Sequence, residues 1–240
     1  MVNCRRCAVL TGAGISAESN VPTFRGKDGL WDKFRPEELA NMDAFLNNPK
    51  VVWEWYNWRR ELIGKTEPNA GHYALRDLEP LFDDFTLITQ NVDGLHRRAG
   101  SLNVLEVHGN ITANKCVNCN APASDDLVID PDSIPRCEKC GGQLRPDVVW
   151  FGEMLPARTI DDAMGAANRA ELFFSIGTSA VVHPAAGLPI MAKRSGATLV
   201  EVNPEPTPIT SMADFVFQEP SGQLMPRLVE AFTVRRRDSE

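Results

Sequence analysis

The chain has 240 residues, of which 43% are hydrophobic and 24% charged, proportions typical of a soluble globular protein. Its formal net charge of −7 disfavours nucleic-acid binding, which normally requires a basic face. The apolar stretches are far shorter than the ~18 residues of a membrane span, and the N-terminus lacks the apolar core of a secretion signal. We therefore expect a cytoplasmic, monomeric protein that binds neither membranes nor nucleic acid.

Along the chain, short apolar runs alternate with longer stretches of helical spacing. The runs predict five buried strands, at Cys7–Leu10, Thr86–Thr89, Val104–Val107, Leu172–Ile176 and Thr198–Val202. Helices are expected within Asn69–Leu81, Ala163–Ala170 and Ala185–Arg194. This alternation predicts an α/β fold, with a parallel sheet covered by helices on both faces. Ligands of such folds bind beyond the carboxyl ends of the strands, so the turns after the strands are candidates for one site.

Two segments interrupt the alternation. Leu30–Lys65 carries four of the five tryptophans in a helix-like pattern, and Lys115–Arg145 is rich in Cys, Asn, Asp and Pro with little periodicity. We interpret them as two insertions that together form a smaller second domain, with bounds of 30–77 and 114–147. The large domain is then formed by residues 1–29, 78–113 and 148–240. The charged end, Val234–Glu240, is expected to be a frayed tail.

Four cysteines form two C-x2-C pairs in the second of these segments, Cys116 with Cys119 and Cys137 with Cys140. Four thiolates satisfy the tetrahedral coordination of Zn²⁺, and this spacing is typical of zinc ribbons. Because four protein ligands leave no position for water, the zinc is expected to be structural rather than catalytic. The alternative of four unliganded cysteines is disfavoured by the spacing.

A glycine-rich turn, Gly12-Ala13-Gly14-Ile15-Ser16-Ala17, follows the first predicted strand and precedes a helical stretch. The pattern G-x-G-x-x-A lets the backbone approach a pyrophosphate, and the next helix offers free N–H groups. Alone, the pattern also fits a simple tight turn. A dehydrogenase would place an acidic residue after a second strand about twenty residues on. Gly26–Asp32 does not have the pattern of a strand, so hydride transfer is not the favoured chemistry.

Taken together, the motifs resemble those of the sirtuins and occur in sirtuin order over nearly the whole chain. Besides Gly12–Ser16 and the cysteine pairs, they are Pro22–Arg25, Gln90–His96, His108-Gly109, Phe151–Glu153, Gly177–Ser179 and Val202-Asn203. The resemblance implies a Rossmann-type large domain and a small domain made of a helical module and a zinc ribbon. It also implies an enzyme that consumes NAD to remove acyl groups from lysines of proteins or peptides. The products would be nicotinamide and O-acyl-ADP-ribose.

The same resemblance implies which residues bind NAD. They are Gly12, Ala13, Gly14, Ile15, Ser16, Glu18, Phe24, Arg25, Trp31, Gln90, Asn91, Asp93, Gly177, Thr178, Ser179, Asn203 and Ser221. Asp93 would hold the nicotinamide amide, Asn91 would order the ribose and a water molecule, and Phe24 would shield the reactive ribose face. Ser179, Asn203 and Ser221 would contact the adenosine end. From the residues alone, Asn91 and Asp93 could also form an Asx turn after a strand.

His108 is the expected general base, and Asn91 is the second residue expected to act in catalysis. The reaction requires a ribose hydroxyl to lose its proton near neutral pH, for which histidine has a suitable pKa. His108 follows a predicted strand and matches the position of the sirtuin base. His72 and His96 lie in predicted helices and are interpreted as structural.

The acyl preference is predicted from Tyr56 and Arg59, which share one face of a predicted helix. A hydroxyl and a guanidinium can hold a carboxylate together, although core packing of the ring and a solvated arginine would also explain the pair. Tyr-x-x-Arg resembles the class III sirtuins, which accept succinyl- and malonyl-lysine, and Ala40 matches the small residue that widens their acyl pocket. The resemblance implies desuccinylation and demalonylation with some deacetylation. Val149 and Phe151 are expected to pair with the substrate peptide by strand addition.

Three other functions could share some of these motifs. A zinc-containing NAD oxidoreductase would need a catalytic Cys/His/Glu metal set and an acidic residue at a strand end, and the sequence has neither pattern. A non-catalytic binding module would not explain the grouping of Asn91, Asp93 and His108 after strands. An NAD-dependent ADP-ribosyl transferase would share the cleavage of the cofactor and differ only in the acceptor.

Overall fold

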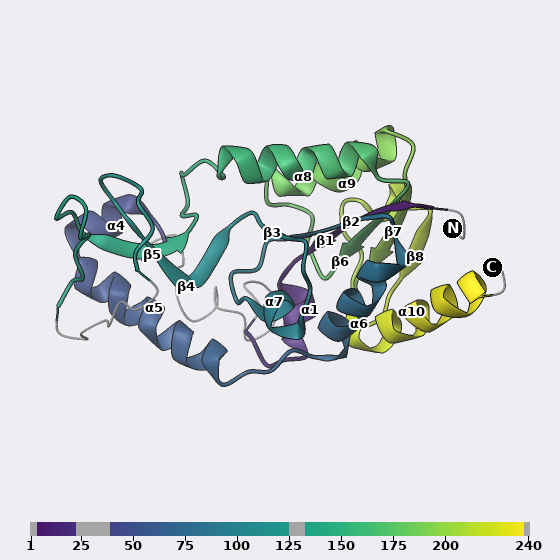
Figure 1. The fold of residues 1–240 in the computed structure, drawn as a ribbon, viewed down its shortest axis with the longest axis horizontal. Coiled ribbons are helices and arrows are strands. Elements are labelled where there is room, and N and C mark those ends of the chain that lie inside the picture. Colours follow the sequence, from purple (N-terminus) through teal and green to yellow (C-terminus); the bar gives the residue numbers. More distant parts are fainter. Residues whose placement is uncertain (1–3, 23–38, 125–132, 238–240) are drawn as a thin grey trace.

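The computed structural model describes residues 4–22, 39–124 and 133–237. These residues form two lobes, a large one around a six-stranded sheet and a small one around a two-stranded sheet (Figure 1). The six strands are parallel and lie in the order β3-β2-β1-β6-β7-β8, the common order of a Rossmann sheet. They are β1 (Arg6–Thr11), β2 (Asp84–Thr89), β3 (Val104–Glu106), β6 (Leu172–Ile176), β7 (Thr198–Val202) and β8 (Phe215–Phe217). The predicted fold class is therefore confirmed.

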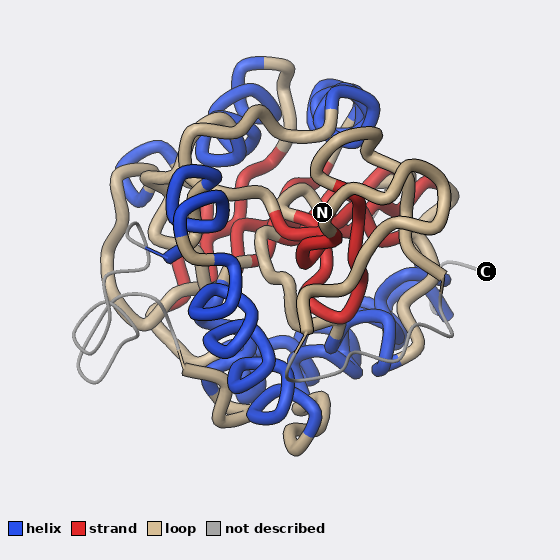
Figure 2. The backbone as a smooth tube through the Cα atoms, turned by 90° about the vertical axis from the view of Figure 1, so that its left-hand side faces the viewer, coloured by secondary structure: helices blue, strands red, loops and turns tan. Residues whose placement is uncertain are grey.

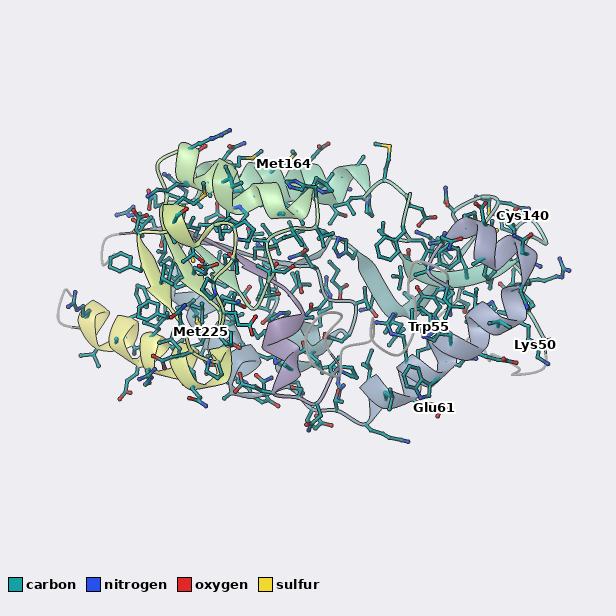
Figure 3. The ribbon with its side chains drawn as sticks, turned by 180° about the vertical axis from the view of Figure 1, so that it is seen from behind. Lys50, Trp55, Glu61, Cys140, Met164 and Met225 are labelled. Carbon is teal, nitrogen blue, oxygen red and sulfur yellow. The ribbon has the colours of Figure 1, made fainter. Side chains whose placement is uncertain are left out.

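Helices cover both faces of the large sheet because side chains on its buried strands alternate between two cores. On β1, Val9 packs with α6 (Ala70–Leu78) and α10 (Ser221–Arg237), whereas Ala8 packs with α8 (Ala157–Arg169) and α9 (Leu188–Arg194). Consecutive apolar residues thus supply both layers, as expected for a doubly covered parallel sheet. Figure 2 shows the strands in the middle of the molecule with helices around them. In Figure 3, Met164 of α8 and Met225 of α10 lie on opposite sides of the sheet.

Of the other described helices, α5 in the small lobe is long and the rest are short. They are α1 (Ala13–Ala17), α4 (Met42–Asn47), α5 (Pro49–Gly64) and α7 (Leu95–Ala99), with 3-10 turns at Glu79–Leu81, Ala185–Gly187 and Thr210–Met212. α5 begins after the N-cap Asn48, and Pro49 occupies the first position, where a missing N–H costs nothing. No helix in the described ranges is long and apolar enough to cross a bilayer.

The small lobe has its own core of aromatic side chains. Strands β4 (Gly109–Cys116) and β5 (Leu144–Val148) pair antiparallel and pack against α4 and α5. The indole N–H of Trp53 donates to the Leu144 carbonyl at 3.2 Å, which ties α5 to β5. Trp55 and Cys140, labelled in Figure 3, lie in this lobe. Two insertions distant in sequence therefore form one packed unit.

Two elements lie across the boundaries expected between the two domains, a division that stays a prediction. α6 lies almost entirely in the range 30–77 expected for the small domain, whereas its residues Ala74 and Leu75 pack in the core of the large sheet. Its apolar face is needed to cover β1 and β2. The β4–β5 pairing begins at Gly109, so the strand pair crosses the boundaries expected at 113 and 148.

The C-terminal region also differs from expectation. β8 has only three residues, too few for a periodic signal, and was not predicted. α10 contains Pro226 and continues to Arg237, so the first residues of the expected tail are helical. The internal proline obscures the helical pattern in the sequence, because proline normally interrupts a helix.

Candidate active site

The loops after β1 and β6 meet where the strand order reverses, the usual ligand position in this fold. The N–H of Gly12 donates to the Ile176 carbonyl at 3.0 Å, and the N–H of Gly14 donates to the Gly177 carbonyl at 2.8 Å. A Cβ at Gly14 would lie 2.7 Å from the Gly177 Cα, closer than real contacts allow. The glycines expected to bind NAD therefore also let two backbone segments pack together. Helix α1 begins at Ala13 in this turn, and its residue Ile15 is buried.

Asn91 and Asp93 follow β2 and hydrogen-bond to the start of α1. The Asn91 amide donates to the Gly12 carbonyl and to the Ser16 hydroxyl oxygen, both at 3.1 Å. The Ser16 hydroxyl donates to Asp93 Oδ2 at 2.8 Å, and Asp93 Oδ1 accepts the Leu95 N–H at 2.9 Å. The Asx turn considered as an alternative is thus present at Asp93, and it is joined to the glycine loop. Burial raises the pKa of Asp93, while the bonds from Leu95 and Ser16 lower it.

Two buried histidines, His72 and His96, lie next to this polar cluster. His72 Nδ1 lies 3.3 Å from the Asn69 N–H and accepts it, so the ring hydrogen is on Nε2, which lies 3.4 Å from the Ser16 hydroxyl oxygen. His96 Nε2 lies 2.9 Å from the Thr11 hydroxyl, and the two rings are 4.8 Å apart. Burial lowers the pKa of His72 to about 4 and lowers that of His96 well below its usual range. Both rings are therefore neutral and act as hydrogen-bonding groups of the core.

His108 lies in the turn between β3 and β4. The strand predicted to end at Val107 ends one residue earlier, at Glu106, so this turn contains Val107 and His108. Its Nδ1 lies 2.9 Å from the Gln90 carbonyl oxygen. A carbonyl only accepts, so Nδ1 carries the hydrogen and Nε2 of the neutral ring has a free lone pair. Burial lowers the pKa of His108, and the bond to Gln90 partly offsets this. The Gln90 amide donates to the Thr178 hydroxyl at 2.8 Å, so β2 and β6 are linked beside the histidine.

The residues expected at the adenosine end, Ser179, Asn203 and Ser221, follow β6 and β7 or begin α10. Ser179 and Asn203 follow β6 and β7, and the Asn203 amide donates to the Glu205 carbonyl at 2.6 Å. Glu18 and Ser221 come together although they are far apart in sequence, because Glu18 Oε1 accepts the Gly222 N–H at 2.8 Å and the Ser221 hydroxyl at 3.4 Å. Phe24, Arg25 and Trp31, also expected to bind NAD, lie outside the described residues.

Tyr56 and Arg59 are both buried in the small lobe, with exposed fractions of 0% and 7%. The Arg59 guanidinium lies over the Trp55 ring at 4.9 Å and over the Tyr56 ring at 5.7 Å, so a solvated arginine is excluded. The indole N–H of Trp150 donates to the Tyr56 hydroxyl oxygen at 2.8 Å. Burial lowers the pKa of Arg59, and the nearby Tyr56 and Asp93 raise it and so partly offset this lowering.

The segment expected to pair with a peptide lies between His108 and Ala40, the residue expected to widen an acyl pocket. The Val149 N–H donates to the His108 carbonyl at 2.9 Å, and the Phe151 N–H donates to the Ala40 carbonyl at 2.9 Å. Phe151 also forms a parallel bridge with Asn41, and its side chain is exposed. Val149 and Phe151 therefore connect His108 with Ala40.

The four cysteines of the two C-x2-C pairs form a compact cluster at the end of β4. Their sulfur atoms all lie within 4.8 Å of one another, with Cys116 and Cys140 3.4 Å apart and Cys119 and Cys137 3.8 Å apart. Four thiolates at this spacing fit a tetrahedral zinc ion. Within the described ranges this is the one group of Cys, His or acidic residues that could hold a metal.

Two residues of the polar cluster were missed in the sequence. The Asn69 amide donates to the Ile15 carbonyl at 2.8 Å and to the Ser19 hydroxyl at 2.9 Å, so it holds α1 to α6. Thr11 donates to Thr89 at 2.8 Å between β1 and β2. Asn69 could have been found as an N-cap before a helical stretch, whereas Thr11 carries no local signal.

Comparisons with known proteins agree with this geometry. The Sir2 family profile matches residues 12–184. The NAD-dependent protein deacylase of Aquifex aeolicus is 58% identical over 210 residues, which are 88% of each chain. The NAD-dependent protein deacylase 1 of Archaeoglobus fulgidus is 50% identical over 220 residues, 92% of this chain and 90% of that one.

Solved structures give the same result. The crystal structure of a Sir2 homolog–NAD complex has a TM-score of 0.90 at 47% identity and covers 97% of this chain and 91% of that one. A Sir2–p53 peptide–NAD+ structure has a TM-score of 0.85 at 34% identity and covers 97% and 95%. The chain belongs to the Sir2 family.

Proposed function

We propose that this protein is an NAD-dependent protein-lysine deacylase that releases nicotinamide, O-acyl-ADP-ribose and the free lysine side chain. Membership of the Sir2 family supports this proposal, as do close relatives named NAD-dependent protein deacylases. The observation that carries it is the grouping of Ser16, Asn91, Asp93 and His108 at the carboxyl ends of β1, β2 and β3. Similarity to a Sir2 homolog–NAD complex supports NAD as the cofactor.

Different residues of this chain would bind different parts of NAD. NAD supplies a ribose carbon from which the cationic nicotinamide can leave. Asp93 and Asn91, fixed by their bonds to Ser16 and Gly12, would hold the nicotinamide amide and the ribose. The glycine loop would face the pyrophosphate, and Ser179, Asn203 and Ser221 would face the adenosine. Phe24, Arg25 and Trp31 would complete the site.

His108 is suited to the proton transfer that the reaction requires. Its Nδ1–H is held by the Gln90 carbonyl, so Nε2 is the atom that can accept the proton of a ribose hydroxyl. Because burial lowers the pKa of His108, the ring is neutral near pH 7 and ready to act as a base. The four cysteines would hold zinc away from this site, as a structural ion.

The substrates we propose are succinyl- and malonyl-lysines of proteins or peptides, with acetyl-lysine as a weaker substrate. Tyr56 and Arg59 lie on one helix in the same buried region, and Arg59 is electrostatically coupled to Asp93 of the NAD site. A carboxylate that enters this region leaves water, which is unfavourable unless a cation meets it. Ala40 lies beside this region, where its carbonyl accepts the Phe151 N–H. Val149 and Phe151, whose N–H groups already donate within the protein, would pair with the peptide through their other backbone groups.

Product analysis separates this function from its rivals. With NAD and an acyl-lysine peptide, a deacylase releases nicotinamide and deacylated peptide in equal amounts. An oxidoreductase would instead raise the absorbance of reduced nicotinamide, and an ADP-ribosyl transferase would leave ADP-ribose on the acceptor with its acyl group intact. Nicotinamide release that does not depend on the acyl group would contradict the proposal.

A further inference from the structure

The Tyr56 hydroxyl has a hydrogen that the protein does not use. Its oxygen accepts the Trp150 indole N–H at 2.8 Å, and in the described part of the chain no acceptor is placed for its own hydrogen. The side chain is fully buried, where a polar group without a partner is unfavourable. The hydrogen of the Tyr56 hydroxyl can therefore be donated to a ligand that reaches this region.

The contact between Tyr56 and Trp150 can have only one direction. An indole N–H donates and never accepts, so the Tyr56 oxygen must be the acceptor and its hydrogen must point elsewhere. Burial raises the pKa of Tyr56, so the hydroxyl keeps this hydrogen at neutral pH. An O–H whose oxygen already accepts a hydrogen bond is polarised into a stronger donor. Trp150 thus sets both the direction and the strength of Tyr56 as a donor.

Trp150 is itself held on its ring face and at its backbone. The Arg145 guanidinium lies 3.5 Å from the centre of the indole ring, and the Phe45 ring packs against the indole at 5.4 Å. Arg145 forms an ion pair with Glu153, and Glu153 Oε2 accepts the Trp150 backbone N–H at 2.8 Å. Since Arg145 and Trp150 are almost fully buried, the indole cannot turn away from Tyr56 without breaking these contacts.

We propose that Trp150 is a specificity-determining positioning residue, whose indole N–H fixes the Tyr56 hydroxyl as a donor to the carboxylate of a succinyl or malonyl group. This inference rests on the proposed function and goes beyond it by naming a residue that does not touch the acyl chain. An acetyl group has no carboxylate and gains nothing from this donor. Loss of the indole N–H should therefore change the selectivity between acyl groups.

The test is the ratio of kcat/KM for succinyl-lysine and acetyl-lysine in the same peptide. Trp150→Phe keeps an aromatic ring and removes the N–H, and we expect the ratio to fall about 3- to 10-fold, the value of one hydrogen bond. Tyr56→Phe should lower the ratio at least as much. The double variant should equal Tyr56→Phe alone, because Trp150 acts through Tyr56.

Trp53→Phe is the matched control. It also removes a buried indole N–H from the same core, but that N–H donates to the Leu144 carbonyl rather than to Tyr56. We expect it to lower stability without changing the succinyl-to-acetyl ratio. An equal fall of the ratio in Trp53→Phe would contradict the inference, because it would reflect general loosening of the core.

The outcomes distinguish this inference from the proposed function. A wild-type protein without preference for succinyl-lysine contradicts both. A wild-type preference that Trp150→Phe leaves unchanged, or a further fall of the ratio when Trp150→Phe is added to Tyr56→Phe, contradicts the inference alone.

If Trp150→Phe does not fold, indole spectra of the wild-type protein and Tyr56→Phe replace it. Five tryptophans give five indole N–H signals. One signal should shift in Tyr56→Phe, and the same signal should shift when succinyl-lysine peptide binds to the wild type but not when acetyl-lysine peptide binds. Five signals unmoved by the succinyl-lysine peptide would contradict the inference.

Discussion

The Nδ1 atom of His108 lies 2.9 Å from the carbonyl oxygen of Gln90, and this bond determines which ring nitrogen can act as a base. Because Nδ1 donates, only Nε2 can accept a proton in the neutral ring. His108→Tyr should therefore lower turnover about 10²-fold or more, the usual cost of losing a general base. The fold and zinc content should survive. His183→Tyr, at an exposed histidine, is the control and should retain turnover.

The pH dependence of activity tests the protonation state of His108. Burial lowers the pKa of His108, so the neutral form persists below the usual titration range. Activity should fall only as the pH drops through a midpoint below ~6.5, the ordinary value for histidine. The measurement is the pH dependence of kcat/KM, and a midpoint above ~6.5 would contradict the assignment.

Arg59 should determine the preference for a carboxylate. A hydrogen bond to a charged group contributes ~1.5–3 kcal/mol, so Arg59→Met should lower desuccinylation by about 10- to 150-fold. Acetyl-lysine turnover should change little or rise. Arg60→Met is the matched control, because Arg60 lies on the same helix but donates to the Ile111 carbonyl at 2.6 Å. An equal loss of both activities in Arg59→Met would mean that Arg59 is a packing residue.

Zinc binding and stability should be lost together. Cys137→Ser removes one of four thiolates whose sulfurs lie within 4.8 Å, so metal content and the unfolding temperature should both fall. Cys4→Ser, outside the cluster, should change neither. The measurement is metal analysis alongside thermal unfolding, and a stable, fully active, metal-free Cys137→Ser protein would show that the zinc is not structural.

The buried His72 should make the fold sensitive to acid. Its pKa is about 4 in the folded protein and ~6.5 when unfolded, so the unfolded chain binds a proton first as the pH falls. Stability that is fully present above ~6.5 should therefore be lost towards pH 4, by up to ~1.4 kcal/mol per pH unit. His96 acts in the same direction. Urea unfolding of His72→Gln should show a smaller slope between these pH values, and an unchanged slope would exclude His72 as a source.

Much of the fold could be predicted from the sequence because its strands are buried on both faces. Leu172–Ile176 and Thr198–Val202 were predicted with the boundaries that the structure has, since each is a mainly apolar run that ends in a polar or glycine-containing turn. The cysteine spacing predicted a cluster that the structure brings together. Local sequence patterns predict an element well where all of its residues are buried, as in these strands.

The remaining features depend on contacts between distant segments. α6 follows the tryptophan-rich helix α5 in sequence, whereas Leu75 of α6 packs against the large sheet. The bond between Glu18 and Gly222 and the bond between Trp150 and Tyr56 join residues far apart in the chain. No local pattern predicts such pairs, because they exist only once the layers have packed.

The most direct test of the account is mass spectrometry of the products formed from NAD and one peptide that carries succinyl-lysine. We expect the peptide to lose its succinyl group and the group to be recovered on ADP-ribose, with one nicotinamide released for each peptide. His108→Tyr should lower the formation of both products together, by about 10²-fold or more. Recovery of an intact succinyl-peptide bearing ADP-ribose, or of free succinate with NAD unconsumed, would contradict it.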